Sequence, residues 1–140
     1  MNRYAYVRYD YAKPFKKIMQ IVEAEEIPEY LSGGGWVDIT ANPAVQVGWK
    51  AETINYVDWV FSEPTYQERE KDVAQDALEL LTAASKWLLV HPLQYKADLG
   101  VATPDDQALL LAYKQYCVEL GDMSKQSGYP YTVNWPLAPF

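Results

Sequence analysis

The sequence predicts an α+β protein: a small aromatic-rich antiparallel β unit, then an antiparallel helical hairpin, then an extended tail rich in proline and aromatic residues. The hydrophobic period is about two before Pro64 and about 3.6 after it, which indicates strands followed by helices. Helix-starting residues, Thr103-Pro104-Asp105-Asp106, stand directly before an apolar stripe. Prolines beyond residue 127 exclude a further helix. We therefore expect a β-rich domain at 1–63, a hairpin at 64–126 and a tail at 127–140.

A strand is expected at Arg3–Tyr9, which is rich in Tyr and Val. Ile18–Val22 fits a strand or the start of a helix, and its β-branched residues favour the strand. Four glutamates follow around Pro28, at positions 23, 25, 26 and 29. The ligand spacing of a calcium loop is absent there, so we interpret them as a solvated acidic turn. Residues 32–35, Ser-Gly-Gly-Gly, are expected to form a flexible turn, since they lack the Gly-Lys-Ser/Thr end of a phosphate loop.

Three more strands are expected, at Trp36–Thr40, Val45–Trp49 and Tyr56–Phe61. Alternation along the first of them places Trp36, Asp38 and Thr40 on one face. The short connections favour an antiparallel meander of these three strands, because a parallel neighbour needs a long crossover. The boundary with the helical part is expected at residues 62–65.

From Tyr66 to about Val90, apolar residues recur at helical spacing. Pro92 lies within the continuing pattern, and a proline in a helix interior costs about 3 kcal/mol. We therefore expect either one long helix bent near residues 86–92 or two abutting helices. Leu99-Gly100 ends this segment, and the short loop before Pro104 makes the next helix antiparallel to it.

The helix from Thr103 to Leu120 is marked at both ends. Thr103 is a good N-cap, Pro104 suits the first helical position, and two aspartates follow at the positive end of the helix dipole. Gly121 stands where a C-terminal glycine is expected. The apolar stripe predicts that Cys117 is buried; its members are Leu109, Ala112, Tyr113, Tyr116, Cys117 and Leu120.

The tail carries aromatic residues at positions 129, 131, 135 and 140. They have two interpretations: they pack back on the hairpin, or they dock a partner. We favour packing, because the tail covers apolar surface that a hairpin alone leaves open.

The second helix and the tail carry a family resemblance. Residues 102–116, Ala-Thr-Pro-Asp-Asp-Gln-Ala-Leu-Leu-Leu-Ala-Tyr-Lys-Gln-Tyr, and residues 133–136, Val-Asn-Trp-Pro, are similar to the C-terminal signature of phage tail fibre assembly proteins. That signature runs roughly Ala-Thr-x-Glu-Glu-x-x-x-Leu-x-x-Trp-Lys-x-Tyr-Arg, then Asp-Trp-Pro. This chain differs at Tyr113, Cys117 and Asn134, where the family has Trp, Arg and Asp. The resemblance covers residues 64–140 well and residues 35–63 more weakly.

The net charge of −7 is shared by both halves of the chain and disfavours nucleic-acid binding, which needs clustered cations. No apolar run approaches membrane-spanning length, and the start of the chain lacks a signal-peptide core. Cys117 is the one cysteine, which fits a reducing compartment. With the resemblance, these features imply the host bacterial cytoplasm, without a membrane or nucleic-acid partner. Retention on the virion stays open.

Catalysis is not expected. His91, the one histidine, and Cys117 fall about one helical turn or more apart on antiparallel helices, too far for a nucleophile and its base. One His and one Cys cannot form a zinc site. Asp105 and Asp106 are explained by the helix dipole. We therefore expect no enzyme activity, no cofactor and no metal.

Five Trp and twelve Tyr are too many for a core of this size to hide, so some of them are expected at a partner surface. The resemblance implies a chaperone that binds the distal C-terminal region of a phage tail fibre protein and promotes its folding and trimerisation. It also implies that the N-terminal part binds the fibre. The candidate partner-binding residues are Trp36, Trp49, Tyr56 and Trp59, and we expect about half of them to be core instead.

The alternative function is a virion-associated or carbohydrate-binding accessory module, in which the same rings stack on sugar faces. The sequence does not indicate which fibre is served, whether the protein leaves after assembly, or whether it forms a homo-oligomer.

Overall fold

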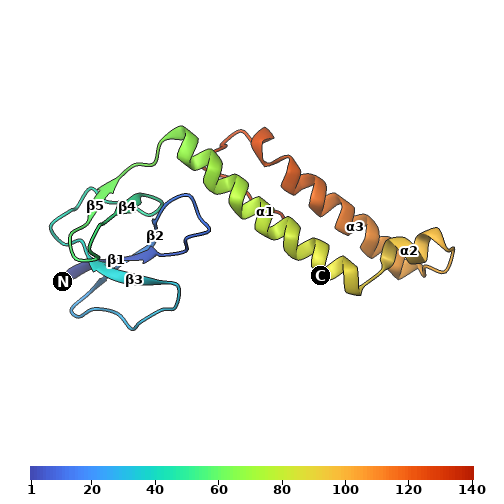
Figure 1. Ribbon diagram of the computed structural model, residues 1–140, viewed down its shortest axis with the longest axis horizontal. Coiled ribbons are helices and arrows are strands. Elements are labelled where there is room, and N and C mark those ends of the chain that lie inside the picture. Colours follow the sequence, from blue (N-terminus) through green and yellow to red (C-terminus); the bar gives the residue numbers. More distant parts are fainter. The chain divides into compact units, whose positions relative to one another are not determined.

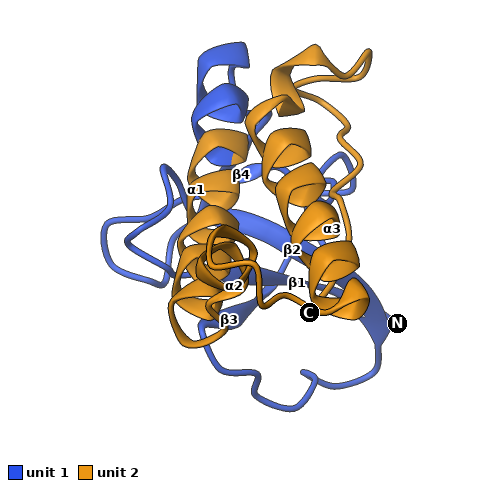
Figure 2. Ribbon diagram, turned by 90° about the vertical axis from the view of Figure 1, so that its right-hand side faces the viewer, with its two compact units in different colours: residues 1–72 blue, residues 73–140 orange.

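The computed structural model describes residues 1–140 and divides into two compact units. Unit 1 comprises residues 1–72 and unit 2 comprises residues 73–140 (Figure 2). Unit 1 contains every strand, and unit 2 contains most of the helical residues. The fold is therefore α+β, as predicted. The division into three parts at residues 63 and 126 stays a prediction.

Five strands form the sheet of unit 1: β1 Asn2–Arg8, β2 Lys17–Ala24, β3 Gly34–Asp38, β4 Lys50–Glu52 and β5 Val60–Ser62. Their order across the sheet is β3-β1-β2-β4-β5, and all neighbours pair antiparallel (Figure 1). The two strands expected near the start of the chain are confirmed. Gly34 and Gly35 belong to β3, so the expected flexible turn at residues 32–35 is wrong in its second half.

The predicted meander of three consecutive strands is also wrong, because β3 pairs with β1 and no strand forms at Val45–Trp49. The guanidinium group of Arg3 donates hydrogen bonds of 2.8 to 3.3 Å to three carbonyl oxygens of the 42–45 turn. Gly48 then adopts a φ of 91°, outside the extended region. Arg3 therefore holds this segment as a turn, and only its end reaches β2: the Gly48 N–H donates to the Ile18 carbonyl at 2.8 Å, and the Ile18 N–H donates to the Trp49 carbonyl at 2.9 Å.

The strand expected at Tyr56–Phe61 is partly correct, since only its last part lies in β5. Tyr56 has a φ of 59°, a left-handed conformation that an extended strand cannot contain. Hydrogen bonds to the side chains of Thr53 and Asn55 hold this turn. Local polar side chains therefore override the β propensity of the aromatic run.

The apolar core of unit 1 lies against one face of the sheet. Alternation along β1 directs Ala5 and Val7 to this core and Tyr4 and Tyr6 to the opposite face. The buried members of the core are Ala5, Val7, Ile18, Ile39, Val45 and Ala51. Burial of one aliphatic side chain stabilises the fold by about 1.5–3 kcal/mol, so this cluster contributes much of the stability of unit 1.

The long helix α1, Tyr66–Val90, begins in unit 1 and continues into unit 2. It ends just before Pro92, and the short helix α2, Leu93–Asp98, follows. Of the two alternatives, two abutting helices are therefore observed, because proline lacks the N–H that would continue α1. Gly100 has a φ of 71°, which glycine adopts without a steric penalty, and the chain reverses there.

The third helix, α3, Pro104–Gly121, runs antiparallel beside α1, and the expected hairpin is confirmed (Figure 1). The Thr103 hydroxyl accepts a hydrogen bond from the Asp106 N–H at 3.1 Å, and the Asp106 carboxylate accepts one from the Thr103 N–H at 3.0 Å. This is a complete capping box. Gly121 is the last residue of α3 and Asp122 is the C-cap, so the expected glycine cap is wrong.

The buried core of unit 2 consists of Ala84, Tyr116 and Leu120, with Trp135 of the tail packed against it. A 3₁₀ turn, Met123–Lys125, leads from α3 into the tail. Trp135 comes from the irregular last stretch of the chain, so the tail packs back on the helices, the alternative that we favour from the sequence.

Cys117 is only half-buried, so its predicted burial is wrong. It lies against the core of unit 2, beside Tyr113, at the margin of the apolar stripe. Burial, ahead of the contact with Cys117, raises the pKa of the Tyr113 hydroxyl. The predicted stripe is thus only partly correct: its members Tyr116 and Leu120 are buried, but the third buried residue of α3, Leu110, lies outside it.

Candidate partner-binding surface

Four aromatic residues of unit 1, Tyr9, Tyr11, Tyr56 and Trp59, gather into what we call the aromatic cluster. The rings of Tyr9 and Trp59 stack with centroids 6.0 Å apart. Tyr56 meets both rings edge-on, at 5.4 Å and 6.0 Å. The hydroxyl groups of Tyr11 and Tyr56 share a hydrogen bond of 2.8 Å. Ring pairs in such geometries are each worth about 0.5–1.5 kcal/mol beyond their buried area, so the cluster holds its own shape.

The turn before β5 presents Tyr56 to solvent. The backbone N–H of Tyr56 donates a hydrogen bond to the Thr53 hydroxyl at 2.9 Å. The side-chain oxygen of Asn55 accepts hydrogen bonds from the N–H groups of Val57 and Asp58 at 2.9 and 2.8 Å. Tyr56 is 48% exposed. The same turn exposes Ile54 and Val57, and Val60 at the start of β5 is exposed as well. A turn stiffened by side-chain hydrogen bonds can carry apolar groups into water without collapsing onto the core.

A lysine completes the aromatic cluster. The Lys16 ammonium lies 5.3 Å from the Tyr11 ring centroid and 5.5 Å from that of Tyr56, within the range of a cation–π contact. The hydrogen bond with Tyr56 raises the pKa of the Tyr11 hydroxyl. Burial, followed by the neighbouring tyrosines, raises the pKa of Tyr9. Both phenols therefore stay protonated at neutral pH, and the cluster is positive at one rim and neutral elsewhere.

The four residues singled out from the sequence do not form one site. Tyr56 and Trp59 meet in the aromatic cluster, whereas Trp49 packs, half-buried, on the core of unit 1. Trp36 lies on the opposite face of the sheet, with its ring centroid 5.3 Å from that of Tyr6. The sequence reasoning missed Tyr9, Tyr11 and Lys16. Alternation continued from β1 through Tyr9 and Tyr11 was the available signal for the two tyrosines.

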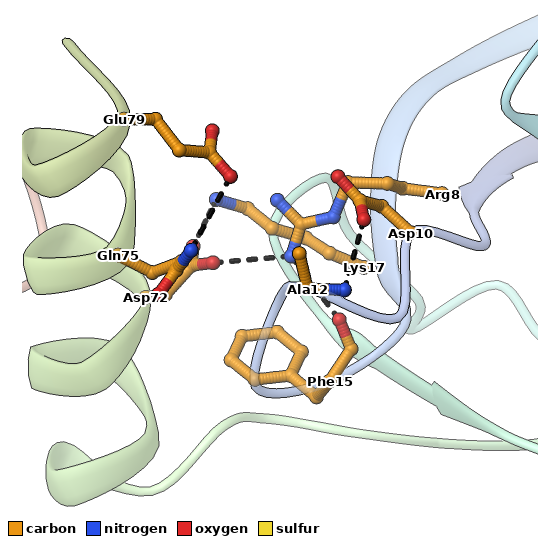
Figure 3. A network of polar contacts seen from close by, with 8 residues as sticks. All are labelled: Arg8, Asp10, Ala12, Phe15, Lys17, Asp72, Gln75 and Glu79. Carbon is orange, nitrogen blue, oxygen red and sulfur yellow. Dashed lines mark hydrogen bonds and ion pairs between the residues drawn. The ribbon is translucent and has the colours of Figure 1, made fainter. Parts of the chain in front are cut away.

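The start of α1 is held to the sheet within unit 1 by ion pairs. Asp72, which is 5% exposed, contacts the guanidinium of Arg8 at 3.0 Å and the ammonium of Lys17 at 2.7 Å (Figure 3). Lys50 of β4 contacts Glu68 at 2.8 Å. The hydrogen bond from Lys50, followed by the one from the Thr65 backbone N–H, lowers the pKa of the Glu68 carboxyl. Each charged group named here faces a counter-charge, although the buried Nε of Arg8 has no hydrogen-bond partner. We interpret these ion pairs as scaffold rather than as a site.

The two residues considered for catalysis have different partners. His91 stacks on Trp87 with ring centroids 4.3 Å apart, and its Nδ1 lies 2.9 Å from the Trp87 carbonyl oxygen. Cys117 packs against the core of unit 2 instead. No group of three or more His, Cys, Asp or Glu side chains is arranged to hold a metal ion. None of the helices has the length and apolar character needed to cross a membrane.

Comparison with known proteins assigns the family. The family described as Caudovirales tail fibre assembly protein, lambda gpK, matches residues 12–139. No curated protein and no solved structure matches the chain. The family match takes in both units, including β2 to β5 and all three α-helices, and it confirms the resemblance seen in the second helix and the tail. The chain therefore belongs to the tail fibre assembly proteins of tailed phages.

Proposed function

We propose that this protein is a chaperone that binds the distal C-terminal region of a phage tail fibre protein and promotes its folding and trimerisation. Membership of the tail fibre assembly family is the observation that carries the proposal. It acts in the host bacterial cytoplasm, without enzyme activity, cofactor, membrane or nucleic acid. The acidic net charge of −7 supports the last point, because phosphate groups bind clustered cations.

The fibre-binding residues are drawn from Trp36, Trp49, Tyr56 and Trp59. Tyr56 is the strongest of them, because it is 48% exposed and is held by a turn that also exposes Ile54 and Val57. Exposed apolar groups on a stiff turn lose little entropy on binding, which favours affinity. Trp49 and Trp59 pack on the core of unit 1, so they contribute through the shape of the surface.

A chaperone of this kind acts by covering surface that the fibre subunit has not yet buried. Subunits of a trimer expose apolar groups and strand edges until they meet, and such groups aggregate. Binding that is weaker than the contacts within the trimer allows the chaperone to be displaced once the fibre assembles. Whether it leaves or stays on the virion depends on that difference in affinity.

The alternative, a carbohydrate-binding accessory module, finds less support. A sugar ring stacks on the open face of an aromatic side chain. In the aromatic cluster, Tyr9 and Trp59 stack on each other, and the Lys16 ammonium lies over the rings of Tyr11 and Tyr56. One face of each of these rings is therefore already in contact with a neighbouring ring or with the lysine.

Co-expression tests the proposal. The tail fibre protein encoded beside this chain is produced alone, with the parent chain, and with each of two variants. Tyr56→Ala removes the candidate anchor, and Tyr95→Ala removes a residue of unit 2 that is even more exposed, at 72%. We expect the parent and Tyr95→Ala to raise the yield of soluble, trimeric fibre, and Tyr56→Ala to lose much of this effect.

Two outcomes contradict the proposal at different points. A fibre that reaches the same yield of soluble trimer with and without the chain overturns the chaperone function. Equal activity of Tyr56→Ala and the parent leaves the chaperone function in place and removes Tyr56 from its surface.

A further inference from the structure

One side of strand β3 has no hydrogen-bonding partner. β3 is the first strand in the order across the sheet, and it pairs only with β1. Strand β5 forms the other edge, but it is three residues long, whereas β3 has five. An unpaired strand edge is a template for an incoming strand.

The register with β1 decides which backbone groups of β3 point outward. Two hydrogen bonds flank the strand: the Tyr9 N–H donates to the Gly33 carbonyl at 2.9 Å, and the Ile39 N–H donates to the Arg3 carbonyl at 2.8 Å. In an antiparallel pair, every second residue exchanges hydrogen bonds with the partner strand. Between these two bonds, three residues turn their N–H and C=O groups away from β1: Gly34, Trp36 and Asp38. No hydrogen bond within the chain takes up these outward groups, but Gly34 is buried, so only Trp36 and Asp38 offer theirs to a partner.

Natural edge strands are commonly protected by lysine, by proline or by a covering segment. β3, Gly-Gly-Trp-Val-Asp, contains neither lysine nor proline. The residue 25–33 segment before it is linked to it by a side-chain hydrogen bond, from the Trp36 indole N–H to the Glu29 carbonyl at 2.9 Å. That bond engages the side chain of Trp36 and none of its backbone groups.

The segment that carries this edge is acidic, and the two arginines of the neighbouring strand β1, Arg3 and Arg8, already bind the 42–45 turn and Asp72. Between Lys17 and Lys50 the chain contains no lysine or arginine. Four exposed carboxylates lie on β3 or on the segment that precedes it: Glu25, Glu26, Glu29 and Asp38. A second copy of β3 pairing antiparallel with the first would bring two such groups of carboxylates together, and like charges across a strand pair are destabilising. Charge therefore selects a basic partner and disfavours self-association at this edge.

We propose that β3 is the docking edge for an extended segment of the tail fibre protein in which Lys or Arg residues stand beside an alternating apolar run. The proposal rests on the proposed function and specifies how the fibre is recognised. The backbone of the segment bonds to Trp36 and Asp38, its cations face the surrounding carboxylates, and alternate side chains meet Trp36. A fibre strand held in this way is shielded until it pairs within the trimer.

Amide hydrogen exchange tests the edge without any mutation. In the free protein, the N–H groups of Gly35 and Val37 are expected to exchange slowly, because they bond to β1, and that of Trp36 is expected to exchange fast. In the complex with the tail fibre protein encoded beside this chain, the Trp36 and Asp38 N–H groups should become protected as well. Exchange at Trp36 that is unchanged by the bound fibre overturns the proposal.

A pair of variants isolates the backbone donor. Trp36→Thr removes the indole but keeps the outward N–H, whereas Trp36→Pro removes both. Proline is tolerated on an edge strand where its N–H faces away from the sheet, and the preceding residue, Gly35, adapts to it. We expect Trp36→Pro to bind the fibre about tenfold more weakly than Trp36→Thr at similar melting temperatures. If both variants fold and bind the fibre equally well, the proposal is overturned. If Trp36→Pro unfolds, the hydrogen-exchange measurement on the parent protein tests the proposal instead.

The charge is tested separately. The triple variant Glu25→Gln, Glu26→Gln, Glu29→Gln should weaken fibre binding and lower its dependence on salt. A matched triple variant at exposed acids elsewhere, Glu63→Gln, Asp98→Asn, Glu119→Gln, should bind like the parent. Equal losses in both variants overturn the basic partner segment. If the parent itself does not bind the fibre, the proposed function fails and the docking edge fails with it. If the parent binds and the variant at Glu25, Glu26 and Glu29 binds equally well, the docking edge fails and the proposed function stands.

Discussion

The carboxylate of Asp72 lies 2.7 Å from the ammonium nitrogen of Lys17, and the same carboxylate contacts Arg8 at 3.0 Å (Figure 3). A charge this well buried is stable only because it is paired. We predict that Asp72→Ala lowers the free energy of unfolding by about 3–5 kcal/mol, since it leaves two cations facing each other without a counter-charge. Chemical denaturation measures the change. A loss below about 1 kcal/mol would show that the contacts are solvated and weak.

The same carboxylate makes stability depend on pH. Burial acts to raise the pKa of Asp72, but the hydrogen bonds and charges of Lys17 and Arg8 outweigh it and hold the pKa below its usual value. A depressed pKa contributes stability above the pKa of the unfolded chain, about 3.9, and that stability is lost as pH falls through the folded value. The difference in unfolding free energy between parent and Asp72→Asn should therefore shrink below about pH 4. A constant difference down to pH 2 would contradict this linkage.

The capping box at α3 predicts a smaller effect. Thr103→Ala removes the acceptor for the Asp106 N–H and should cost about 1 kcal/mol. Thr103→Ser keeps a hydroxyl in place and is the matched control. Thermal unfolding compares the three proteins. If Thr103→Ala and Thr103→Ser melt together with the parent, the hydroxyl contributes nothing to the start of this helix.

The last residue of the chain is predicted to stabilise unit 2. Phe140 stacks on Trp87 with centroids 4.6 Å apart and planes 16° apart, and it meets Tyr116 edge-on at 5.9 Å. Phe140→Ala should lower the free energy of unfolding by about 1–2 kcal/mol. Leu137→Ala, at a side chain that is 92% exposed, should change it by less than about 0.5 kcal/mol. Equal effects of the two substitutions would place Phe140 outside the packed structure.

Alanine substitutions at the four aromatic candidates should distinguish residues that are needed for folding from residues that are needed for fibre binding. Trp59→Ala and Trp49→Ala remove rings packed on the core of unit 1 and should cost up to about 3–5 kcal/mol of stability. Tyr56→Ala should melt nearly like the parent and yet lose co-purification with the fibre, as an exposed anchor does. Trp36→Ala should lose less stability than the variants at Trp49 and Trp59, and less fibre binding than Tyr56→Ala. If each variant that loses the fibre has also unfolded, these rings serve packing alone.

The helices were determined by the sequence itself. The bounds of α1, the break at Pro92 and the N-cap at Thr103 all follow from local rules, because helix hydrogen bonds join residues four apart and the signals lie within one turn. The capping box of α1 is another local signal. Thr65 and Glu68 form reciprocal hydrogen bonds of 3.1 and 3.0 Å, and their spacing of three residues is visible in the sequence.

Only the tertiary structure decided the sheet. Its strands pair residues far apart in the chain, so β3 reaches β1 rather than its neighbour in sequence. Arg3 binds the 42–45 turn, which leads into the segment Val45–Trp49 where a strand was expected. The same holds for the candidate surface: Tyr9 and Trp59 stack although 50 positions separate them in the numbering. Local propensity cannot encode such contacts, because the partner of a strand or ring is set by packing in three dimensions.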